Sequence, residues 1–289
     1  MDTYTLQYAS DLHIDDESPP FSMLIEPVAT ELALCGDICN PFSKLYSDFL
    51  KWCSKKWNKI YLIAGNHEYF TKNPGVLFTE VEEQIRRVVS EAGSNIIFLQ
   101  NEYLFIEQYK IVIIGSTLWS MPTQRHWDKI GVNFIGDPGI KGEYTLMYKK
   151  DKYTGKPRLV HPSDITTMCL KNTAFLRKVL HPTWGIVPDG WRVIVLTHHL
   201  PSVALADTKY KNDPQISCYA AKLDDLLNEP VVAWICGHSH TSRRFRFLSG
   251  TVGCLNPRGY KNQIDTSGYS RKAVIQVYRE NIAIPRILN

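Results

Sequence analysis

Residues 59–68, KIYLIAGNHE, place a short apolar run directly before a glycine and a cluster of polar side chains. An apolar run also precedes polar side chains in TYTLQYASDLH (3–13), TELALCGD (30–37), RVIVLTHH (192–199) and VVAWICGHSH (231–240), with a glycine between them in the second and the fourth. Short runs rich in apolar and β-branched residues predict buried strands. In α/β sheets, ligands bind beyond the carboxyl ends of the strands, because the loops there are free to aim side chains together. We therefore expect an α/β fold with one polar site built from distant segments.

Helical patterns lie between these strands. A capping box at 79–82 predicts the start of a helix that has one apolar face and ends at Gly93. Ser163 likewise predicts the start of a helix that runs through Leu180, before a His-Pro pair. Further strand-like runs occupy the middle of the chain and the part after residue 240. This order of elements predicts two sheets packed face to face with helices outside.

Length and composition exclude several classes of protein. The chain has 289 residues, of which 44% are hydrophobic and 21% charged, so it is neither disordered nor collagen-like nor a coiled coil. The net charge of +4 is too small to mark a dedicated nucleic-acid binder. No apolar run approaches the ~20 residues of a membrane span, and the first residues do not resemble a signal peptide. We expect a single domain over residues 1–289.

One segment, at about 120–162, interrupts the alternation of strands and helices. It is rich in Gly, Pro, Lys, Tyr and Asp, and it is long for a loop inside a compact domain. Two interpretations remain open, an insertion that covers the active site and a mobile surface loop.

The cysteines indicate the compartment. Their number is odd, they are widely scattered, and no CxxC pair occurs, so neither a disulfide framework nor a cysteine zinc site is expected. Buried free thiols in a reducing compartment fit better, which predicts a cytoplasmic protein. The seven residues are Cys35, Cys39, Cys53, Cys169, Cys218, Cys236 and Cys254.

Histidines gather at the predicted strand ends. A lone histidine is usually structural, but six of the nine histidines fall within the five motifs, together with two aspartates and an asparagine. Such a mixture of imidazole, carboxylate and amide donors predicts metal binding. The residues are Asp11, His13, Asp37, Asn66, His67, His198, His199, His238 and His240.

Five motifs, in this order, resemble those of the calcineurin-like metallophosphoesterases: Asp11-Leu12-His13, Gly36-Asp37, Gly65-Asn66-His67-Glu68, Thr197-His198 and Gly237-His238-Ser239-His240. The resemblance spans residues 11–240 and implies a four-layer αββα sandwich of two mixed β-sheets flanked by helices. It further implies that two divalent metal ions are bound. One is held by Asp11, His13, Asp37 and His240, and the other by Asp37, Asn66, His198 and His238.

This set of ligands has a chemical reason. Two cations about 3.5–4 Å apart lower the pKa of a bridging water, so that hydroxide forms near neutral pH, and they neutralise the phosphate under attack. Carboxylates supply charge and can bridge, imidazoles supply directional nitrogen ligands, and the neutral Asn66 adds no repulsion toward an anionic substrate. The donors suit Mn, Fe, Zn or Ni, and manganese is the first candidate.

Catalytic and substrate-binding roles follow from the resemblance. Besides the bridging Asp37, we expect His67 to be catalytic, as the general acid or charge stabiliser that faces the leaving group. Glu68 either orients His67 or is solvated, and we favour the solvated state. Candidate substrate contacts are Trp119, His199, Arg258 and Tyr260, and for Trp119 packing in the core is an equal alternative. Trp119 and the NPRGY sequence at 256–260 resemble a cytosolic bacterial-type branch of the family.

The resulting hypothesis is a metal-dependent phosphodiesterase for a small, nucleotide-like substrate. A phosphomonoesterase is the nearest alternative. A nuclease is less favoured because the charge is weak, and a non-catalytic scaffold is less favoured because every ligand position is filled. Nucleic acid is thus a possible but not a favoured partner, and no membrane partner is expected.

Overall fold

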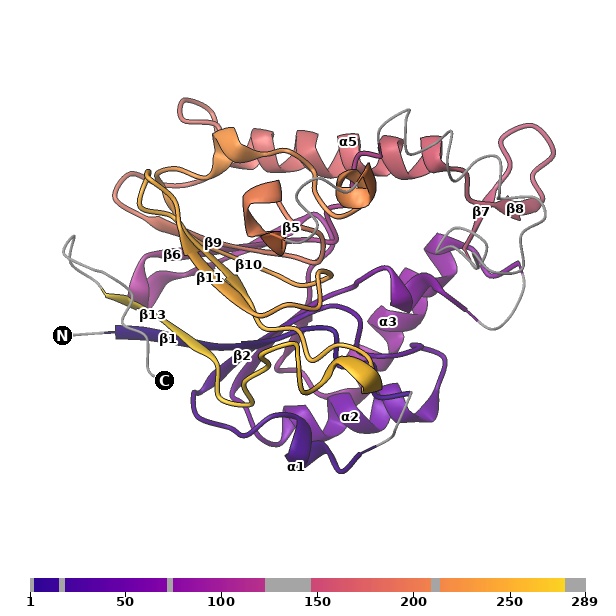
Figure 1. The fold of residues 1–289 in the computed structure, drawn as a ribbon, viewed down its shortest axis with the longest axis horizontal. Helices are drawn as coiled ribbons and strands as arrows, with labels where there is room; N and C mark the ends of the chain where they lie inside the picture. The colour runs from indigo at the N-terminus through magenta and orange to yellow at the C-terminus, as the bar shows by residue number, and fades with distance from the viewer. Residues whose placement is uncertain (1–2, 16–18, 72–74, 123–146, 209–213, 279–289) are drawn as a thin grey trace.

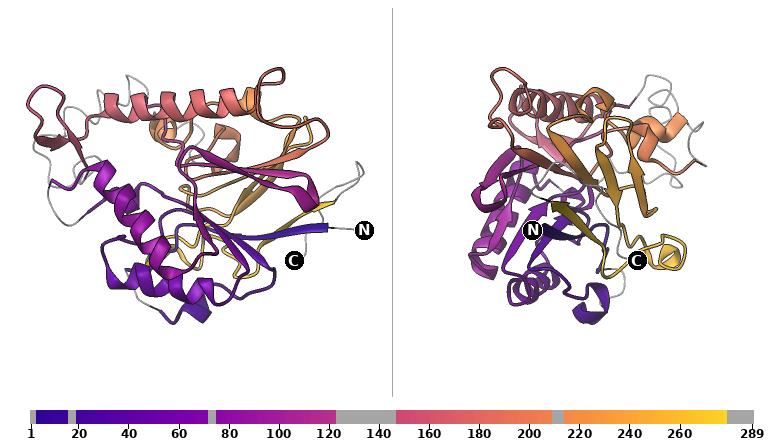
Figure 2. Two further views of the ribbon diagram at one scale, coloured as in Figure 1. Left: turned by 180° about the vertical axis from the view of Figure 1, so that it is seen from behind. Right: turned by 90° about the vertical axis from the view of Figure 1, so that its left-hand side faces the viewer.

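The computed structural model describes residues 3–15, 19–71, 75–122, 147–208 and 214–278. Two β-sheets form the centre of the molecule, with α1, α2 and α3 outside the first sheet and α5 outside the second (Figure 1). The two sheets lie face to face between these helical layers (Figure 2). The expected α/β sandwich with two mixed sheets and helices outside is confirmed.

The first sheet has five strands in the order β13-β1-β2-β3-β4. Its four N-terminal strands run parallel to their neighbours, and β13 pairs antiparallel with β1. The outer helices of this half come from the segments between its strands, as right-handed β-α-β crossovers require. The elements are β1 (Thr3–Ala9), α1 (Phe21–Leu24), β2 (Glu31–Cys35), α2 (Lys44–Ser54), β3 (Lys59–Ile63), α3 (Phe78–Ala92), β4 (Ile96–Phe98) and β13 (Val274–Tyr278).

The second sheet has six strands in the order β11-β12-β10-β9-β6-β5. Its inner strands run parallel, and the edge strands β5 and β11 pair antiparallel with β6 and β12. The elements are β5 (Glu102–Ile106), β6 (Ile111–Ser116), α5 (Pro162–Val179), β9 (Arg192–Thr197), β10 (Val231–Cys236), β11 (Arg243–Arg246) and β12 (Val252–Leu255).

Most central strands are buried on both faces, which explains why their sequences read as continuous apolar runs. Alternate residues point to opposite faces of a strand. In β3, Tyr61 and Ile63 belong to the cluster between the sheets, whereas Ile60 and Leu62 belong to the cluster that includes α2 and α3. Burial on both faces fixes the register, since a shift by one residue would exchange the two sets.

Two helix starts differ from the expected positions. Helix α3 is capped at Leu77, two residues before the expected Thr79, because Glu80 accepts a hydrogen bond from the backbone N–H of Leu77. Helix α5 is capped at His161, whose backbone N–H donates to Asp164. In both cases a carboxylate three residues after the cap satisfies a free helix N–H, so a competing acidic residue moved the boundary.

The interrupting segment at about 120–162 lies partly outside the described residues, which omit 123–146. Its described end forms a two-stranded hairpin of β7 (Tyr148–Lys150) and β8 (Pro157–Leu159) next to the start of α5. Within the described residues, no helix is long and apolar enough to cross a membrane.

Asp164 joins this hairpin to α5. Its buried carboxylate accepts hydrogen bonds from Lys149 at 2.9 Å and from two nitrogens of Arg158 at 2.7 and 2.9 Å. Burial alone would raise the pKa of Asp164, but the bonds from Arg158 and from the backbone of His161 outweigh it and hold this pKa below its usual range.

We therefore expect Asp164→Asn to lower the free energy of unfolding at pH 7 by about 1–3 kcal/mol, as loss of a buried, charge-assisted bond network does. Because the folded pKa is depressed, this contribution is present above the unfolded pKa of about 3.9 and is lost as the pH falls below it. Urea unfolding at pH 7 and pH 3 checks both points, with the exposed Asp189→Asn as control. An equal difference at the two pH values would contradict the assignment.

Candidate metal centre and active site

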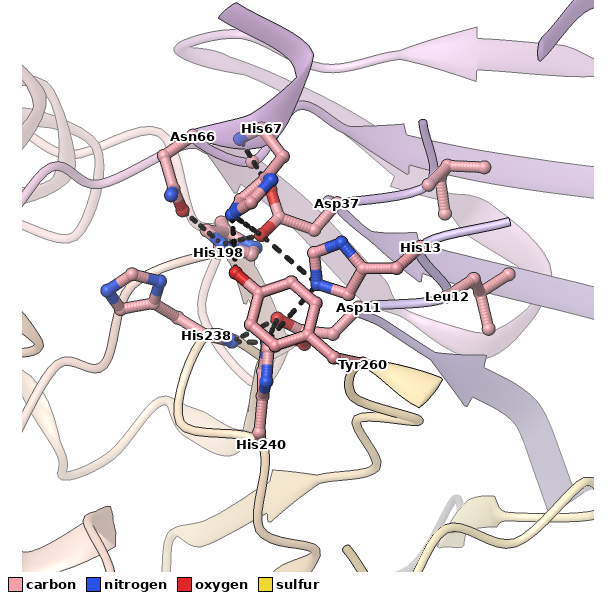
Figure 3. A network of polar contacts seen from close by, with 12 residues as sticks. Asp11, Leu12, His13, Asp37, Asn66, His67, His198, His238, His240 and Tyr260 are labelled. Carbon is pink, nitrogen blue, oxygen red and sulfur yellow. Dashed lines mark hydrogen bonds and ion pairs between the residues drawn. The ribbon is translucent and has the colours of Figure 1, made fainter. Parts of the chain in front are cut away.

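Two groups of metal-ligating side chains meet at the carboxyl ends of the parallel strands (Figure 3). Within each group, one ligand atom of every residue lies within 4.8 Å of the others. Asp37 belongs to both groups, as a carboxylate that bridges two cations does. The first group is Asp11, His13, Asp37 and His240, and the second is Asp37, His198 and His238.

Both sheets contribute to the site. The loops after β1, β2 and β3 supply the residues from the first half of the chain, and the loops after β9 and β10 supply the histidines from the second half. Backbone bonds join these loops, because the N–H of Gly237 donates to the carbonyl of His198 and the N–H of His13 donates to the carbonyl of Asp37. The site is therefore a product of the packing between the sheets.

The backbone at the site is strained in a consistent way. Five predicted ligands have positive φ angles, a region that residues with a Cβ seldom adopt and that clusters at functional sites. The sharp turn after each strand directs the side chain inward. The angles are 51° at Asp11, 42° at His13, 55° at Asp37, 68° at His238 and 49° at His240.

Glycines in the motifs leave room for these side chains. A Cβ on Gly65 would collide with the carboxylate of Asp37, and one on Gly237 would collide with that of Asp11. Gly36, at φ 85°, would meet both the backbone of Gly65 and the ring of His198. Each glycine thus has a steric reason for its place before a ligand.

Hydrogen bonds orient two of the imidazoles. Nδ1 of His198 lies 2.8 Å from the carbonyl oxygen of Cys35, and Nδ1 of His240 lies 2.5 Å from Oε1 of Gln263. Each Nδ1–H donates to its oxygen, so Nε2 of each ring faces the centre of the site. There, Nε2 of His198 lies 3.3 Å from Asp37, and Nε2 of His240 lies 3.2 Å from Asp11.

Burial and charge shift the pKa values of the site in opposite directions. Burial lowers the pKa of His13 to about 3, and it holds that of His238 well below its usual range. For His198, the negative charge of Asp37 outweighs burial and raises the pKa to about 10. Burial would raise the pKa of Asp37, but the neighbouring histidines, His198 foremost, hold it well below its usual range. The site thus keeps its carboxylates ionised and several imidazoles neutral, the forms that bind metals.

The polar atoms of the site fit a bound cation. Oδ2 of Asp37 is buried without a hydrogen-bond partner, although ring nitrogens of His198, His13 and His67 lie 3.3, 3.8 and 4.0 Å from it. Nε2 of His13 also lies 3.2 Å from Nε2 of His240, so two lone pairs face each other unless a proton or a cation lies between them. Metal ions would satisfy both arrangements, since unpaired buried polar atoms are costly.

Asn66 lies beside the second group. Its Oδ1 is 2.8 Å from Nε2 of His198, and its buried Nδ2 has no hydrogen-bond partner among the described residues. The side chain oxygen therefore faces the same space as the ring nitrogen, as expected for a fourth ligand of that group.

Glu68 is not solvated, so the favoured interpretation of this residue was wrong. Its side chain is fully buried, and its two oxygens accept hydrogen bonds from the backbone N–H groups of Asp37, Ile38 and Gly65 at 2.7–2.9 Å. Burial and the charge of Asp37 raise the pKa of Glu68 to about 8. Glu68 ties the turn after β2 to the turn after β3, and it holds the bridging carboxylate in place.

His67 differs from the other histidines of the site. It belongs to neither metal-ligating group, and its side chain is 27% exposed, more than that of His13, His198 or His240. Its backbone N–H donates to Oδ1 of Asp37 at 2.8 Å, which fixes the ring beside the centre. Nε2 of His67 lies 2.8 Å from the hydroxyl of Tyr260 (Figure 3).

Of the four expected substrate contacts, only Tyr260 lines the pocket that contains the metal ligands. This pocket has a volume of about 120 Å³. His199 is buried behind His238, with ring centroids 4.2 Å apart, and Trp119 packs behind His199 at 5.3 Å. Arg258 is also buried, and it donates to the carbonyl of Leu12 at 3.0 Å.

The pocket includes residues that the sequence analysis missed. Gln263 follows Tyr260 in a short 3-10 turn, Lys261–Gln263, and Tyr219 lies with its ring 4.9 Å from that of His238. Neither residue belongs to a strand-end motif, so no local pattern marked them. Only the nearness of Gln263 to the NPRGY sequence could have suggested a role.

The fold and the paired carboxylate and imidazole groups define an α/β protein with a dinuclear-type metal pocket. A sequence model of the family described as calcineurin-like phosphoesterase matches residues 8–242. The chain belongs to this family, whose members typically bind two divalent metals, and it is a metal-dependent phosphoesterase.

Individual proteins resemble this chain to different degrees. The uncharacterized protein L509 of Acanthamoeba polyphaga mimivirus is 28% identical over 276 residues, which cover 89% of this chain and 92% of the relative. Phosphopantetheinyl hydrolase of Mycobacterium tuberculosis has a similar fold, with a TM-score of 0.71, 15% identity and 98% of each chain covered. A dimetal phosphatase of Danio rerio gives a TM-score of 0.48 at 11% identity, over 95% of this chain and 92% of that one.

Gln263 provides a test of how the site is oriented. We expect Gln263→Leu to weaken metal binding about 10- to 100-fold, because loss of such an outer partner frees the ring of His240. Gln263→Glu keeps the acceptor oxygen and should retain tight binding. Isothermal titration of the metal-free protein with Mn²⁺ measures the effect, and equal affinities in the two variants would contradict it.

Proposed function

We propose that the protein hydrolyses a small phosphodiester with a nucleotide-like organic group. The observation that carries this proposal is the charge of the pocket. Among the described residues, its lining contains no lysine or arginine. The lining residues are Asp37, Asn66, His67, Tyr219, His238, Ser239, His240, Tyr260 and Gln263.

The charge of the pocket favours a diester over a monoester. A phosphodiester has one negative charge and a monoester has up to two near neutral pH, with a second pKa of about 6. With Asp11 and Asp37 ionised, two divalent cations leave a net charge of about +2 at the centre. This charge matches a singly charged ester together with the attacking hydroxide, whereas a dianion gains no further cationic side chain from the described lining.

Two tyrosines favour a planar organic group. Tyr219 lies on the side of His238, and Tyr260 lies over His13 and His240, with ring centroids 4.4 and 4.6 Å from theirs. Aromatic side chains at the rim of a pocket stack on bases and other rings. We assign direct substrate contact to Tyr260, and support from behind the lining to His199, Trp119 and Arg258.

The residues divide the work as follows. Asp11, His13, Asp37 and His240 would hold one metal, and Asp37, Asn66, His198 and His238 the second. Mn, Fe, Zn and Ni all suit these donors, and manganese is the first choice for assays. When bound, the metals supply Lewis acidity and a water of lowered pKa. His67, outside both groups, protonates or stabilises the oxygen of the leaving group.

Asp37→Asn tests the bridging carboxylate. The substitution keeps the size of the side chain but removes the negative charge of Asp37. We therefore expect metal content to fall and hydrolysis of bis-(p-nitrophenyl) phosphate to drop at least 10³-fold. Metal-free wild type should regain activity on addition of Mn²⁺, whereas the variant should not. Full activity in the variant would refute the assignment.

His67→Ala separates catalysis from metal binding. We expect turnover to fall about 10²- to 10⁴-fold, with a larger loss for a phenyl than for a p-nitrophenyl ester, while metal content stays normal. His181→Ala, at a partly exposed histidine outside the pocket, is the control. Loss of metal in the His67 variant would make this residue a ligand.

The substrate class is tested by a matched pair. We expect kcat/KM for bis-(p-nitrophenyl) phosphate to exceed that for p-nitrophenyl phosphate at least tenfold, since the leaving group is the same while the diester carries less negative charge and a second aryl group. A reversed order would favour the phosphomonoesterase. Binding of duplex DNA to the protein at physiological salt would instead favour a nuclease.

A further inference from the structure

A second cavity lies behind the active site and shares no lining residue with the metal pocket. It has a volume of about 550 Å³ and lies between the start of α3, strand β7 and helix α5, at the right of Figure 1. A parallel bridge between Leu77 and Tyr148 brings β7 against the start of α3 and helps form this space. The cavity is large enough for a small organic molecule.

One side of the cavity is apolar. Leu77 and Phe78 come from the start of α3, Met168 comes from α5, and Trp119 forms the wall toward the active site. Trp119 and Phe78 pack edge to face, with ring centroids 5.6 Å apart, and both rings contact Tyr69. These contacts make the apolar wall rigid, because each ring is fixed by two others.

The polar groups beneath this wall pair with one another. Asn172 donates to Asn101 at 2.9 Å, and Gln100 donates to Glu82 at 3.0 Å. Glu82, the one carboxylate of the described lining, also accepts from the hydroxyl of Tyr69 at 3.0 Å. One oxygen of this carboxylate, Oε1, is therefore already bonded to donors of the protein.

The other side of the cavity is cationic. Three lysines line it, from two different elements: Lys149 and Lys150 on β7, and Lys171 on α5. Lys149 is paired with Asp164 at 2.9 Å, whereas Lys150 and Lys171 are exposed at the mouth. Two elements thus place positive charge at the opening of a space whose wall is aromatic and aliphatic.

We propose that this cavity is a second binding site, which takes an amphipathic anion: a ring or short chain against Phe78, Trp119 and Met168, with an acidic group between Lys150 and Lys171. Charge complementarity and the apolar wall select this class, since an apolar body gains from burial and its anionic end remains at the mouth. The buried Trp119 separates this ligand from the metals, so the proposal goes beyond the hydrolytic reaction.

The test uses two probes that share an N-phenylnaphthylamine body, of which only one carries an anionic sulfonate group. We expect 8-anilinonaphthalene-1-sulfonate to bind the metal-free protein at one site, and Lys150→Met with Lys171→Met to weaken it roughly fivefold, as loss of two exposed ion pairs would. The uncharged N-phenyl-1-naphthylamine should bind the double variant as well as the wild type. Fluorescence titration gives both affinities.

Two further variants complete the experiment. Met168→Trp fills the cavity and should abolish binding of both probes, while Lys178→Met, on the same helix but outside the cavity, should change neither. Sulfonate binding that is equal in wild type, the double lysine variant and a folded Met168→Trp would overturn the proposal. If Met168→Trp does not fold, the effect of the double lysine variant on sulfonate binding still tests the proposal. Because this binding test uses metal-free protein, its failure would leave the proposed hydrolysis intact. Failure of the hydrolysis assays would likewise leave the proposed second binding site intact.

Discussion

The active site depends on a buried carboxylate that must stay ionised. Asp37 lies at the meeting point of both metal-ligating groups, and its Oδ2 lacks a hydrogen bond while three ring nitrogens lie around it. An isolated carboxylate in such a place would be costly, so cationic partners have to compensate it. Without metal, the raised pKa of His198 supplies this charge, and the neutral rings around it remain ready to bind cations.

The surrounding structure serves to hold this carboxylate. Glu68 receives three backbone N–H groups from the turns after β2 and β3, and Asp37 in turn receives the N–H of His67. The result is a chain of contacts from a buried glutamate to the candidate acid. The positions of His67 and Asp37 are thus coupled through a few hydrogen bonds.

The two cavities have different chemistry. The pocket at the metal centre is small and polar, and its described lining has no lysine or arginine, whereas the larger cavity behind Trp119 has an apolar wall and three lysines. The rings of Trp119, His199 and His238 lie in sequence between them. In our proposals, bound metals would balance the charge of the substrate in the first pocket, and lysines would balance the charge of a ligand in the second cavity.

The sequence determined the strands and the ligand-bearing motifs. Apolar runs such as KIYLI and VVAWIC are buried on both faces. The change from such a run to polar residues marks the end of a strand, so the strand ends that carry Asp37, Asn66 and His238 could be predicted. Glycines before these ligands marked the close approaches.

Only the tertiary structure decided how the remaining residues act. Burial of Glu68 depends on two turns that meet across neighbouring strands, and the sequence placed this residue in solvent. Gln263 and Tyr219 reach the pocket from loops without a local pattern, and Trp119 and Arg258 turn away from it into the protein. The local sequence determines strand periodicity and the residues at turns. Contacts between side chains that are distant in the chain are determined by how the two sheets pack.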